Sequence, residues 1–346
     1  MKFITAFMAV FLFMNPIRLL KQLILLFALL AAPLRADDST RVITLVFGGD
    51  VTLANHFSAY VKDDYAYAFK KMPLFKRADI AMINLENPLT VSNDKQEKLF
   101  NFKAAPRLVQ VLTEGGIDLV TLGNNHIYDF GQNGLLETLE VLNKKGIYYT
   151  GAGRNVKEAH HPLILKRRGI RLAFFSYYGT HKHSNSHPAT IDSAGTAMRR
   201  IALIRRDIEN FRPLADVIIV NFHWGLEKEN YPQKEQIRLA HQVIEAGADL
   251  IIGHHPHVLQ GVELYKGKAV FYSLGNFIFG GNSRTHEFSA VARVEISRRD
   301  GEVSIKPFLM PVEIDHWQPA PADSLGAAAV IDSVKKYSKI FKHSIF

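Results

Sequence analysis

The sequence predicts an α/β protein in which short buried strands alternate with helices. Short apolar runs recur along the chain and stop at glycine or at a polar cluster, as they do within 250–257, and amphipathic helical patterns separate most of them. Strands of such folds end at a common crevice, so polar residues at several strand ends meet there. Apolar residues make up 47% of the 346-residue chain, enough for a sizeable core.

The first part of the chain shows three strand-to-helix transitions. Pro106 suits the first turn of a helix, and leucines at 135, 136, 139 and 142 form one apolar helical face that Gly146 closes. The expected strands are 41–47, 79–84, 118–122 and 147–150, and the expected helices are 65–77, 106–115 and the segment that ends at Gly146.

The second part combines hairpins with two more buried strands. Gly169, Gly267 and Gly301 each mark a tight turn between β-rich runs. The expected hairpins are 162–166 with 170–177, 258–265 with 268–272, and 288–296 with 303–307; the expected helices are 196–211 and 233–246, and the strands 216–221 and 249–252. The tail through Pro319 and Pro321 is expected to be loop, followed by a peripheral helix at 324–341.

The first 36 residues differ from the rest of the chain. They contain basic residues and no acidic one, and two apolar runs that each fall short of the ~20 residues a spanning helix needs. From Met14 onward the pattern is that of a signal peptide, so Met14 is one candidate start; the alternative is an uncleaved N-terminal membrane anchor. Either interpretation predicts an exported protein, periplasmic or on the outer face of the cytoplasmic membrane.

The composition excludes several classes of site. The chain has no cysteine, which rules out disulfides, a thiolate nucleophile and cysteine zinc sites. Its net charge of +9 comes partly from the basic residues at its N-terminus. Basic and aromatic residues do not interleave, so we expect no nucleic-acid partner.

A histidine cluster follows the strand expected at 249–252. Gly253 ends the apolar run, and His254, His255 and His257 follow within four positions. Alternation along an extended segment predicts that His255 and His257 point the same way and His254 the opposite way. Two imidazoles on one face of a stiff loop suit a transition metal, whereas the alternative is a hydrogen-bonded polar turn.

Candidate ligands also follow four other expected strands. Together, the ligands from the five strand ends are Asp50, Glu86, Asn125, His223, and His255 with His257. This mixture of oxygen and nitrogen donors suits manganese, iron or zinc better than calcium or magnesium. Two metals bridged by a carboxylate would lower the pKa of a shared water and clamp a phosphoryl oxygen. His126, next to Asn125, is the candidate catalytic residue, because it could protonate or stabilise a leaving oxygen.

Asp50, Asn125-His126, His223 and His255-x-His257, in this order along the chain, resemble the calcineurin-like metallophosphoesterases. A longer string of motifs resembles the CapA branch, which is the poly-γ-glutamate capsule biosynthesis family. The motifs that carry the resemblance are Gly49-Asp50, Asn84-Leu85-Glu86, Gly123-Asn124-Asn125-His126, His223-Trp224-Gly225, Gly247-Ala248-Asp249, Gly253-His254-His255-Pro256-His257 and Tyr272-Ser273-Leu274-Gly275-Asn276-Phe277. The resemblance runs from about 44 to 279. It implies a four-layer α-β-β-α sandwich of two mixed sheets and an extracytoplasmic role in making or exporting an anionic polymer.

Two positions depart from the metallophosphoesterase pattern. Those enzymes usually carry a histidine two residues after the first aspartate, where this chain has Thr52, and the residue matching their bridging aspartate is Glu86. One firmly held ion, or two ions, is compatible with these residues.

The sequence therefore supports two functional hypotheses. The first is a metal-dependent hydrolase that acts on a phosphoester or on a bond of poly-γ-glutamate or a related envelope polymer. The second is a non-catalytic assembly or export subunit that binds polymer or membrane-embedded capsule synthesis proteins. The expected organisation is a leader or anchor at 1–36, a CapA-like domain at 41–316 and a C-terminal extension at 317–346.

Overall fold

The computed structural model describes residues 42–180, 185–279 and 287–346. The leader or anchor expected at 1–36 lies outside this described part. Residues 41–346 form one compact unit, which includes the segment expected as a C-terminal extension. Among the described residues, no helix is both long enough and apolar enough to cross a membrane.

The first sheet has eight strands and is built around β1. On one side of β1 the strands are parallel to it and to one another: β2, β3 and β4. On the other side β14, β15 and β16 follow in antiparallel order, and β13 pairs with the end of β1. The bounds are β1 Ile43–Val51, β2 Ile80–Leu85, β3 Leu119–Thr121, β4 Tyr148–Thr150, β13 Asn276–Ile278, β14 Glu287–Arg299, β15 Glu302–Asp315 and β16 Gln318–Pro321.

The second sheet has six strands in the order β11-β12-β10-β9-β7-β6. Its four inner strands are parallel, and an antiparallel hairpin partner closes each edge. The bounds are β6 Leu163–Arg167, β7 Ile170–Tyr178, β9 Val217–His223, β10 Leu250–His254, β11 Val262–Tyr265 and β12 Lys268–Phe271. A separate two-stranded ribbon pairs β5 (Ala152–Gly153) with β8 (Gly195–Thr196).

The central strands of both sheets carry apolar side chains on both faces. One face of each sheet packs against the other sheet, and the opposite face packs against helices. In β1, Leu45 and Phe47 enter the core between the sheets, whereas Val46 faces the helices over the first sheet. In β9, Ile219 enters the same inner core, whereas Val220 faces the helices over the second sheet. Strands that bury both faces must lie between helical layers, so this pattern specifies a sandwich of four layers.

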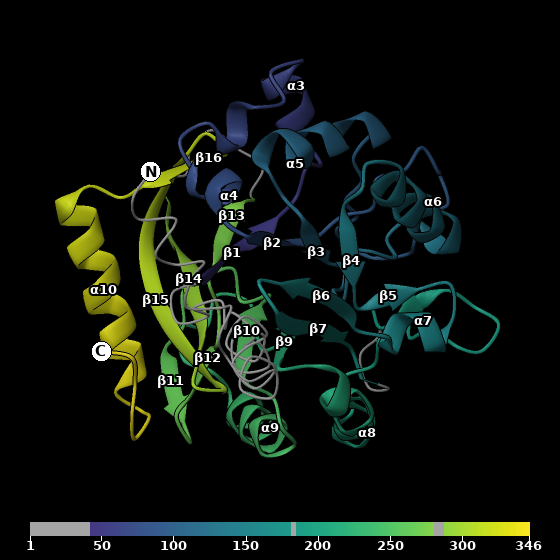
Figure 1. The fold of residues 1–346 in the computed structure, drawn as a ribbon. Helices are drawn as coiled ribbons and strands as arrows, with labels where there is room; N and C mark the ends of the chain where they lie inside the picture. The colour runs from purple at the N-terminus through teal and green to yellow at the C-terminus, as the bar shows by residue number, and fades with distance from the viewer. Residues whose placement is uncertain (1–41, 181–184, 280–286) are drawn as a thin grey trace, which may run out of the picture. The chain divides into compact units, whose positions relative to one another are not determined.

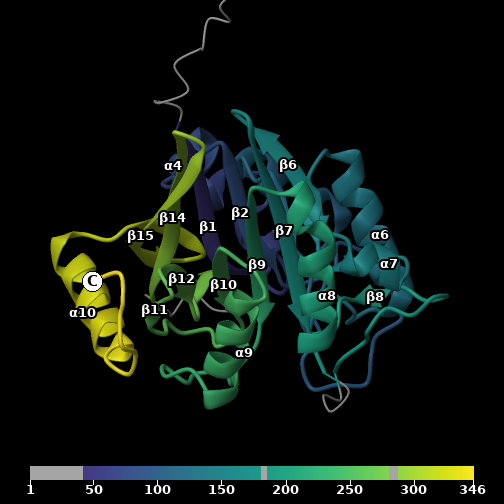
Figure 2. The same ribbon diagram turned by 60° about the horizontal axis from the view of Figure 1, so that its bottom comes forward.

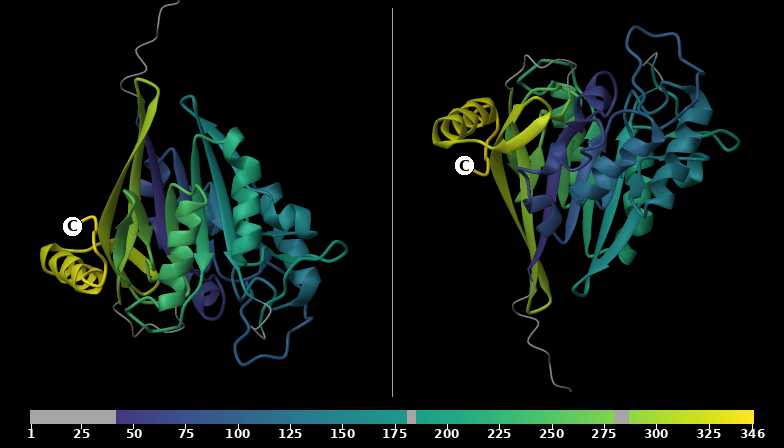
Figure 3. Two further views of the ribbon diagram at one scale, coloured as in Figure 1. Left: turned by 90° about the horizontal axis from the view of Figure 1, so that it is seen from below. Right: turned by 90° about the horizontal axis from the view of Figure 1, so that it is seen from above.

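Helices cover both outer faces of the sandwich (Figure 1). The outer face of the first sheet carries α3 Phe57–Val61, α4 Leu74–Arg77, α5 Val109–Gly115 and α6 Gly131–Lys144, with short 3-10 turns at Tyr67–Phe69 and Pro106–Leu108. The second carries α7 Val156–His160, α8 Ile201–Phe211, the 3-10 turn Arg212–Leu214 and α9 Lys234–Glu245. Helix α10 (Ser324–Ser338) packs beside β15, outside the sheets (Figures 2 and 3). The predicted α-β-β-α sandwich of two mixed sheets is confirmed.

Three local predictions were wrong. The helix expected at 65–77 is interrupted, because Pro73 lacks the N–H that a continuous helix would need, and only Tyr67–Phe69 and Leu74–Arg77 are helical. The helix expected from 196 begins at Ile201, since Thr196 pairs with Ala152. The tail expected as loop forms β16, which pairs with β15 at the edge of the sheet as the described residues form it, and an edge strand tolerates its two prolines.

Candidate metal centre

The structure brings all the predicted site residues to the carboxyl ends of strands from both sheets. The first sheet supplies Asp50 near the end of β1, Glu86 just after β2, and Asn125 with His126 after β3. The second sheet supplies His223 at the end of β9 and His255 with His257 after β10. Since these strand ends face each other, residues more than two hundred positions apart come into contact.

Asp50 is fixed by the irregular end of β1. The register of β1 against β2 shifts between Phe47 and Asp50, where β13 joins the other side of the strand. Gly49 permits this approach, because a Cβ there would lie 2.0 Å from the Gly275 carbonyl oxygen. Asp50 is thereby fully buried between two neighbouring strands.

Two buried amides orient the carboxylates. The Asn84 side chain donates hydrogen bonds to Asp50 Oδ1 at 2.8 Å and Glu86 Oε2 at 3.3 Å. Asn124 in turn donates to Asn84 Oδ1 at 3.1 Å, and its own Oδ1 accepts from the backbone N–H of His126 at 3.1 Å. Asn84 and Asn124 belong to the sequence motifs but were not predicted as site residues. They position the ligand side chains.

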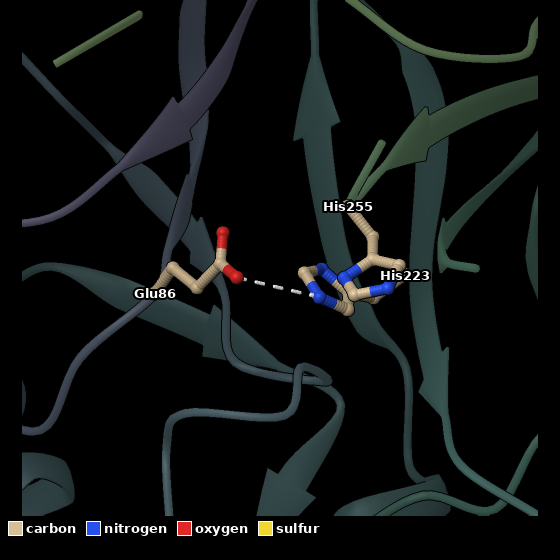
Figure 4. Close-up of side chains that lie close together, drawn as sticks. All are labelled: Glu86, His223 and His255. Carbon is tan, nitrogen blue, oxygen red and sulfur yellow. Dashed lines mark ion pairs between the residues drawn. The ribbon is translucent and has the colours of Figure 1, made fainter. Parts of the chain in front are cut away.

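The nitrogen donors approach from the second sheet. His223 Nε2 lies 2.6 Å from Asn125 Oδ1 and 3.5 Å from Glu86 Oε1, and its ring is 4.5 Å from that of His255. Figure 4 shows Glu86 reaching toward His223, with His255 beside it. His257 Nδ1 lies 3.3 Å from Asp50 Oδ2, and its Nε2 lies 3.9 Å from Glu86 Oε1.

The prediction that His254 points away from His255 and His257 was wrong. His254 Nδ1 lies 3.4 Å from Asp50 Oδ1, so it also faces the site. Strand alternation stops at this point, because His255 and His257 have φ values of 99° and 57° in the left-handed region. The turn allows the His255 N–H to bond Asp50 Oδ2 at 3.2 Å and brings His254 and His257 to the same carboxylate. Such strain in non-glycine residues is typical of functional loops.

The residues present fit a metal. Glu86 Oε1 is buried and makes no hydrogen bond to any described residue. Glu86 belongs to two groups of metal-ligand side chains, each with its ligand atoms within 4.8 Å of one another: Glu86 with His223 and His255, and Glu86 with Asp50 and His257. An unsatisfied buried carboxylate oxygen is costly unless a cation or donor reaches it. The geometry therefore suits a carboxylate that bridges two cation positions.

Thr52 does not take part in either group. Its hydroxyl accepts a hydrogen bond from the Ala54 N–H at 3.3 Å, as part of the turn that follows β1. The group of Asp50, Glu86 and His257 therefore offers fewer candidate ligands than the group of Glu86, His223 and His255, beside which Asn125 Oδ1 also lies.

The pKa values of the site show how strongly the charges interact. Burial, followed by the charge of Asp50, raises the pKa of Glu86 well above its usual value. Burial alone would raise the pKa of Asp50, but contacts with His254 and His257 lower it well below the usual value. Burial lowers the pKa of His223. Burial also opposes protonation of His257, but Glu86 and Asp50 outweigh it and raise the pKa of His257 to about 9. The carboxylates thus draw positive charge to this position.

His126 is held beside the metal-ligand groups by a buried carboxylate. Its Nδ1 lies 2.7 Å from Asp129 Oδ2, and Lys98 forms an ion pair with the same carboxylate. The ring packs on Phe102 at 4.2 Å between centroids. Phe102 in turn contacts Phe279, which packs on His257 at 4.3 Å. Burial lowers the pKa of His126, against the opposing effect of Asp129. With Nδ1 donating to Asp129, Nε2 is the nitrogen that can exchange a proton.

Sequence reasoning missed Asp129 and Lys98. Asp129 lies three residues after His126, a spacing that could have suggested a local histidine–carboxylate pair. Lys98 gave no signal, because its segment was expected as polar loop. It reaches the site through contacts to Asp129 and to the Asn125 carbonyl oxygen at 2.7 Å.

Comparison with known proteins identifies the family. Residues 44–281 match the model of the bacterial capsule synthesis protein PGA_cap. The chain belongs to this family. It is 29% identical over 323 residues to the capsule biosynthesis protein CapA of Bacillus anthracis, covering 90% of this chain and 75% of that protein. It is 30% identical over 311 residues to the PGA biosynthesis protein CapA of Bacillus subtilis, covering 88% and 80%.

A solved structure, the calcineurin-like phosphoesterase YfkN from Bacillus subtilis, aligns with a TM-score of 0.48 and 15% identity, covering 85% of this chain and 97% of that one. The family assignment rests on the sequence matches. The resemblance to the CapA family, stated from the motifs alone, is confirmed by them.

Proposed function

We propose that this member of the PGA_cap family is an extracytoplasmic, metal-dependent hydrolase of capsule biosynthesis. Its substrate would be a phosphoester or a bond of poly-γ-glutamate or a related anionic polymer. Two Bacillus relatives, named for capsule and PGA biosynthesis, support the polymer context. The leader-like composition of residues 1–36 supports export.

One observation carries the proposal. Carboxylate, amide and imidazole side chains from five strand ends converge around a buried, unsatisfied oxygen of Glu86. Structural carboxylates are normally satisfied by arginine, lysine or backbone donors, whereas this one faces ring nitrogens at 3.5 Å and 3.9 Å. Such a donor set is what a transition metal requires.

The division of roles follows from the positions of the side chains. Glu86, Asn125, His223 and His255 would hold one ion, and Asp50, Glu86 and His257 the other, with manganese, iron or zinc the best match to the donors. A divalent ion there would act as a Lewis acid on the scissile group and make water more acidic. His126 would exchange a proton with the leaving oxygen through Nε2, while Asp129 fixes its ring and stabilises the imidazolium form.

The test compares the purified full-length protein with His126→Gln, which keeps the predicted metal ligands. Both are loaded with Mn²⁺ and assayed on an aryl phosphate and on poly-γ-glutamate. We expect turnover that chelation abolishes and that His126→Gln lowers by about 10²–10⁴-fold. Metal-bound wild-type protein without turnover on either substrate would contradict the enzymatic role.

Thr52 favours a second candidate function. Since its hydroxyl is used in a local turn, an ion beside Asp50 would have Asp50, Glu86 and His257 as its ligands in that group, without the histidine that metallophosphoesterases usually carry at position 52. A family member with such a site could serve as a non-catalytic assembly or export subunit that binds polymer or membrane-embedded synthesis proteins. Polymer output in the producing cell distinguishes the two functions. A hydrolase loses output with His126→Gln, whereas a binding subunit retains it.

A further inference from the structure

A carboxylate outside the predicted set lies next to the histidine loop. Glu227 is exposed in the segment between β9 and α9. Its carboxylate and the ring nitrogens of His255 and His257 lie within 4.8 Å of one another, a third group with metal-ligand spacing.

Hydrogen bonds fix the Glu227 segment to the histidine loop. The Lys228 N–H donates to the Pro256 carbonyl oxygen at 2.7 Å, in the middle of the His255–His257 turn. Gln260 Nε2 donates to the Glu229 carbonyl oxygen at 2.7 Å, and Asn230 Nδ2 to that of Leu259 at 3.0 Å. Because Glu227 is flanked by these contacts, its backbone is positioned relative to the two histidines before any ligand binds.

The turn into this segment also depends on one glycine. Gly225 has φ 87°, and a Cβ there would lie 2.7 Å from Gln236 Oε1. Gln236 is buried and donates through Nε2 to Gln260 Oε1 at 3.3 Å. The sharp reversal after His223 and Trp224 is therefore built into the fold, and it directs the chain back toward the histidine loop.

We infer that Glu227 is a further ligand, from the solvent side, of the ion that His257 holds. This inference rests on the proposed metal centre. Glu227 shares His257 with the group of Asp50 and Glu86, and it shares His255 with the group of Glu86 and His223. Asn125 already lies beside the second of these groups, so the first is the one with room for a further ligand. The group of Asp50, Glu86 and His257 has no fourth ligand, because the Thr52 hydroxyl bonds within a local turn. Glu227 supplies that ligand from a different strand end.

The chemistry of this donor set has two consequences. Three carboxylates and one imidazole form an oxygen-rich set, which favours Mn²⁺ or Fe²⁺ over softer ions. Asp50 and Glu86 together would balance only part of the positive charge of two divalent ions. The carboxylate of Glu227 balances a further part. Because Glu227 is exposed whereas His223 is buried, we expect the ion that Glu227 and His257 hold to exchange with solvent more readily than the ion that His223 holds.

Metal titration of the full-length protein tests this inference, with Glu227→Gln compared against Glu229→Gln. Glu229 is exposed in the same segment, belongs to none of the three groups, and makes its hydrogen bond to Gln260 through the backbone. Calorimetric Mn²⁺ titration and elemental analysis should show two ions in wild type. Glu227→Gln should weaken binding of the ion that His257 holds by at least about 10-fold, whereas Glu229→Gln should bind Mn²⁺ as wild type does. Circular dichroism checks that each variant is folded.

The possible results separate the inference from the proposed function. Equal Mn²⁺ affinity and stoichiometry in Glu227→Gln and Glu229→Gln would overturn the role of Glu227 and leave the metal centre standing. A wild-type protein that binds no Mn²⁺, Fe²⁺ or Zn²⁺ would overturn the metal centre itself, and the inference with it. If Glu227→Asp binds the ion held by His257 more tightly than Glu227→Gln does, direct ligation is supported, because the aspartate variant keeps a carboxylate.

Discussion

Carboxylates lie at both the amino and the carboxyl ends of the strands of the sandwich, and their surroundings differ in kind. At the amino ends of the strands, aspartates pair with arginine. Asp79, before β2, contacts Arg168 at 2.8 Å, and Asp216, before β9, contacts Arg171 at 3.1 Å and Arg298 at 2.9 Å. At the carboxyl ends, the ion-pair partners of Asp50 and Glu86 among the described residues are imidazoles alone.

Two of these ion pairs join the two sheets at the amino ends of the strands. Asp79 belongs to the first sheet and Arg168 to the β6–β7 turn of the second. Asp216 leads into the second sheet, whereas Arg298 lies in β14 of the first. One end of the sandwich is thus closed by satisfied ion pairs, and the other end is left with carboxylates that need a cation.

The pKa values show the same difference. The hydrogen-bonded guanidinium of Arg171 lowers the pKa of Asp216 to about 2, despite partial burial. Burial and a neighbouring carboxylate instead raise the pKa of Glu86. The same functional group is therefore structural where a permanent cation is supplied by the chain, and available for a ligand where it is not.

The largest expected effect comes from Glu86→Gln at the carboxyl end. Glu86 belongs to the group with His223 and His255 and to the group with Asp50 and His257. Its loss should therefore weaken the binding of both ions by more than about 100-fold, because loss of a residue that only orients a ligand typically weakens metal binding by about 10–100-fold. The metal-free protein should be no less stable, because the change removes a buried charge without a permanent cation. Calorimetric metal titration and chemical unfolding in chelator measure the two effects. Wild-type metal affinity in this variant would contradict the site.

A smaller effect is expected from Asp129→Asn, which leaves the metal ligands in place. Asp129 orients His126 and stabilises its charged form, so turnover should fall by about 10–100-fold while metal content stays at the wild-type level. The pH–rate profile should change, because the pKa of His126 loses the raising contribution of Asp129. Steady-state rates across pH, with elemental analysis of the same samples, measure this. An unchanged profile would show that Asp129 is structural only.

At the amino end, Asp216→Asn should affect stability and leave metal binding unchanged. The variant loses ion pairs to Arg171 and Arg298 that are partly exposed, so we expect a loss of about 1 kcal/mol in the free energy of unfolding. Urea unfolding in chelator gives this value, and metal titration provides the control. If metal affinity also fell, the two ends of the strands would not be independent.

The smallest expected effect is the pH dependence of that same ion pair. The folded-state pKa of Asp216 is lowered to about 2, so its stabilisation is fully present above the ordinary aspartate pKa of about 3.9. It is lost as the pH falls toward the folded-state value. The difference in unfolding free energy between wild type and Asp216→Asn should therefore shrink between about pH 4 and pH 2. A difference that stays constant over this range would contradict the pKa.

Much of the fold could be predicted from local patterns. Short apolar runs with glycine or polar ends predicted the buried strands, and amphipathic spacing predicted α6 and α9. The wrong predictions arose where single residues or strand position, rather than the hydrophobic period, decided the local structure. Pro73 interrupts a helical pattern, and the prolines of β16 are tolerated because that strand lies at an edge.

The site was predicted only in part, for a similar reason. Residues at strand ends could be named, because parallel strands end at a common edge. His254 was placed on the wrong side, since strand alternation does not describe a turn with left-handed residues. Asp129, Lys98 and Glu227 lie in irregular segments, where no period indicates direction.

By itself, the sequence determined the α/β class, the strand ends that carry polar residues and the kinship with PGA_cap proteins, because these depend on composition, period and motif order. Only the tertiary structure decided which carboxylates are satisfied and which are not. Arginines reach Asp79 and Asp216 across the two sheets, and none among the described residues reaches Glu86. That difference depends on how the sheets pack, since a buried charge takes its properties from groups that are distant in the chain and adjacent in space.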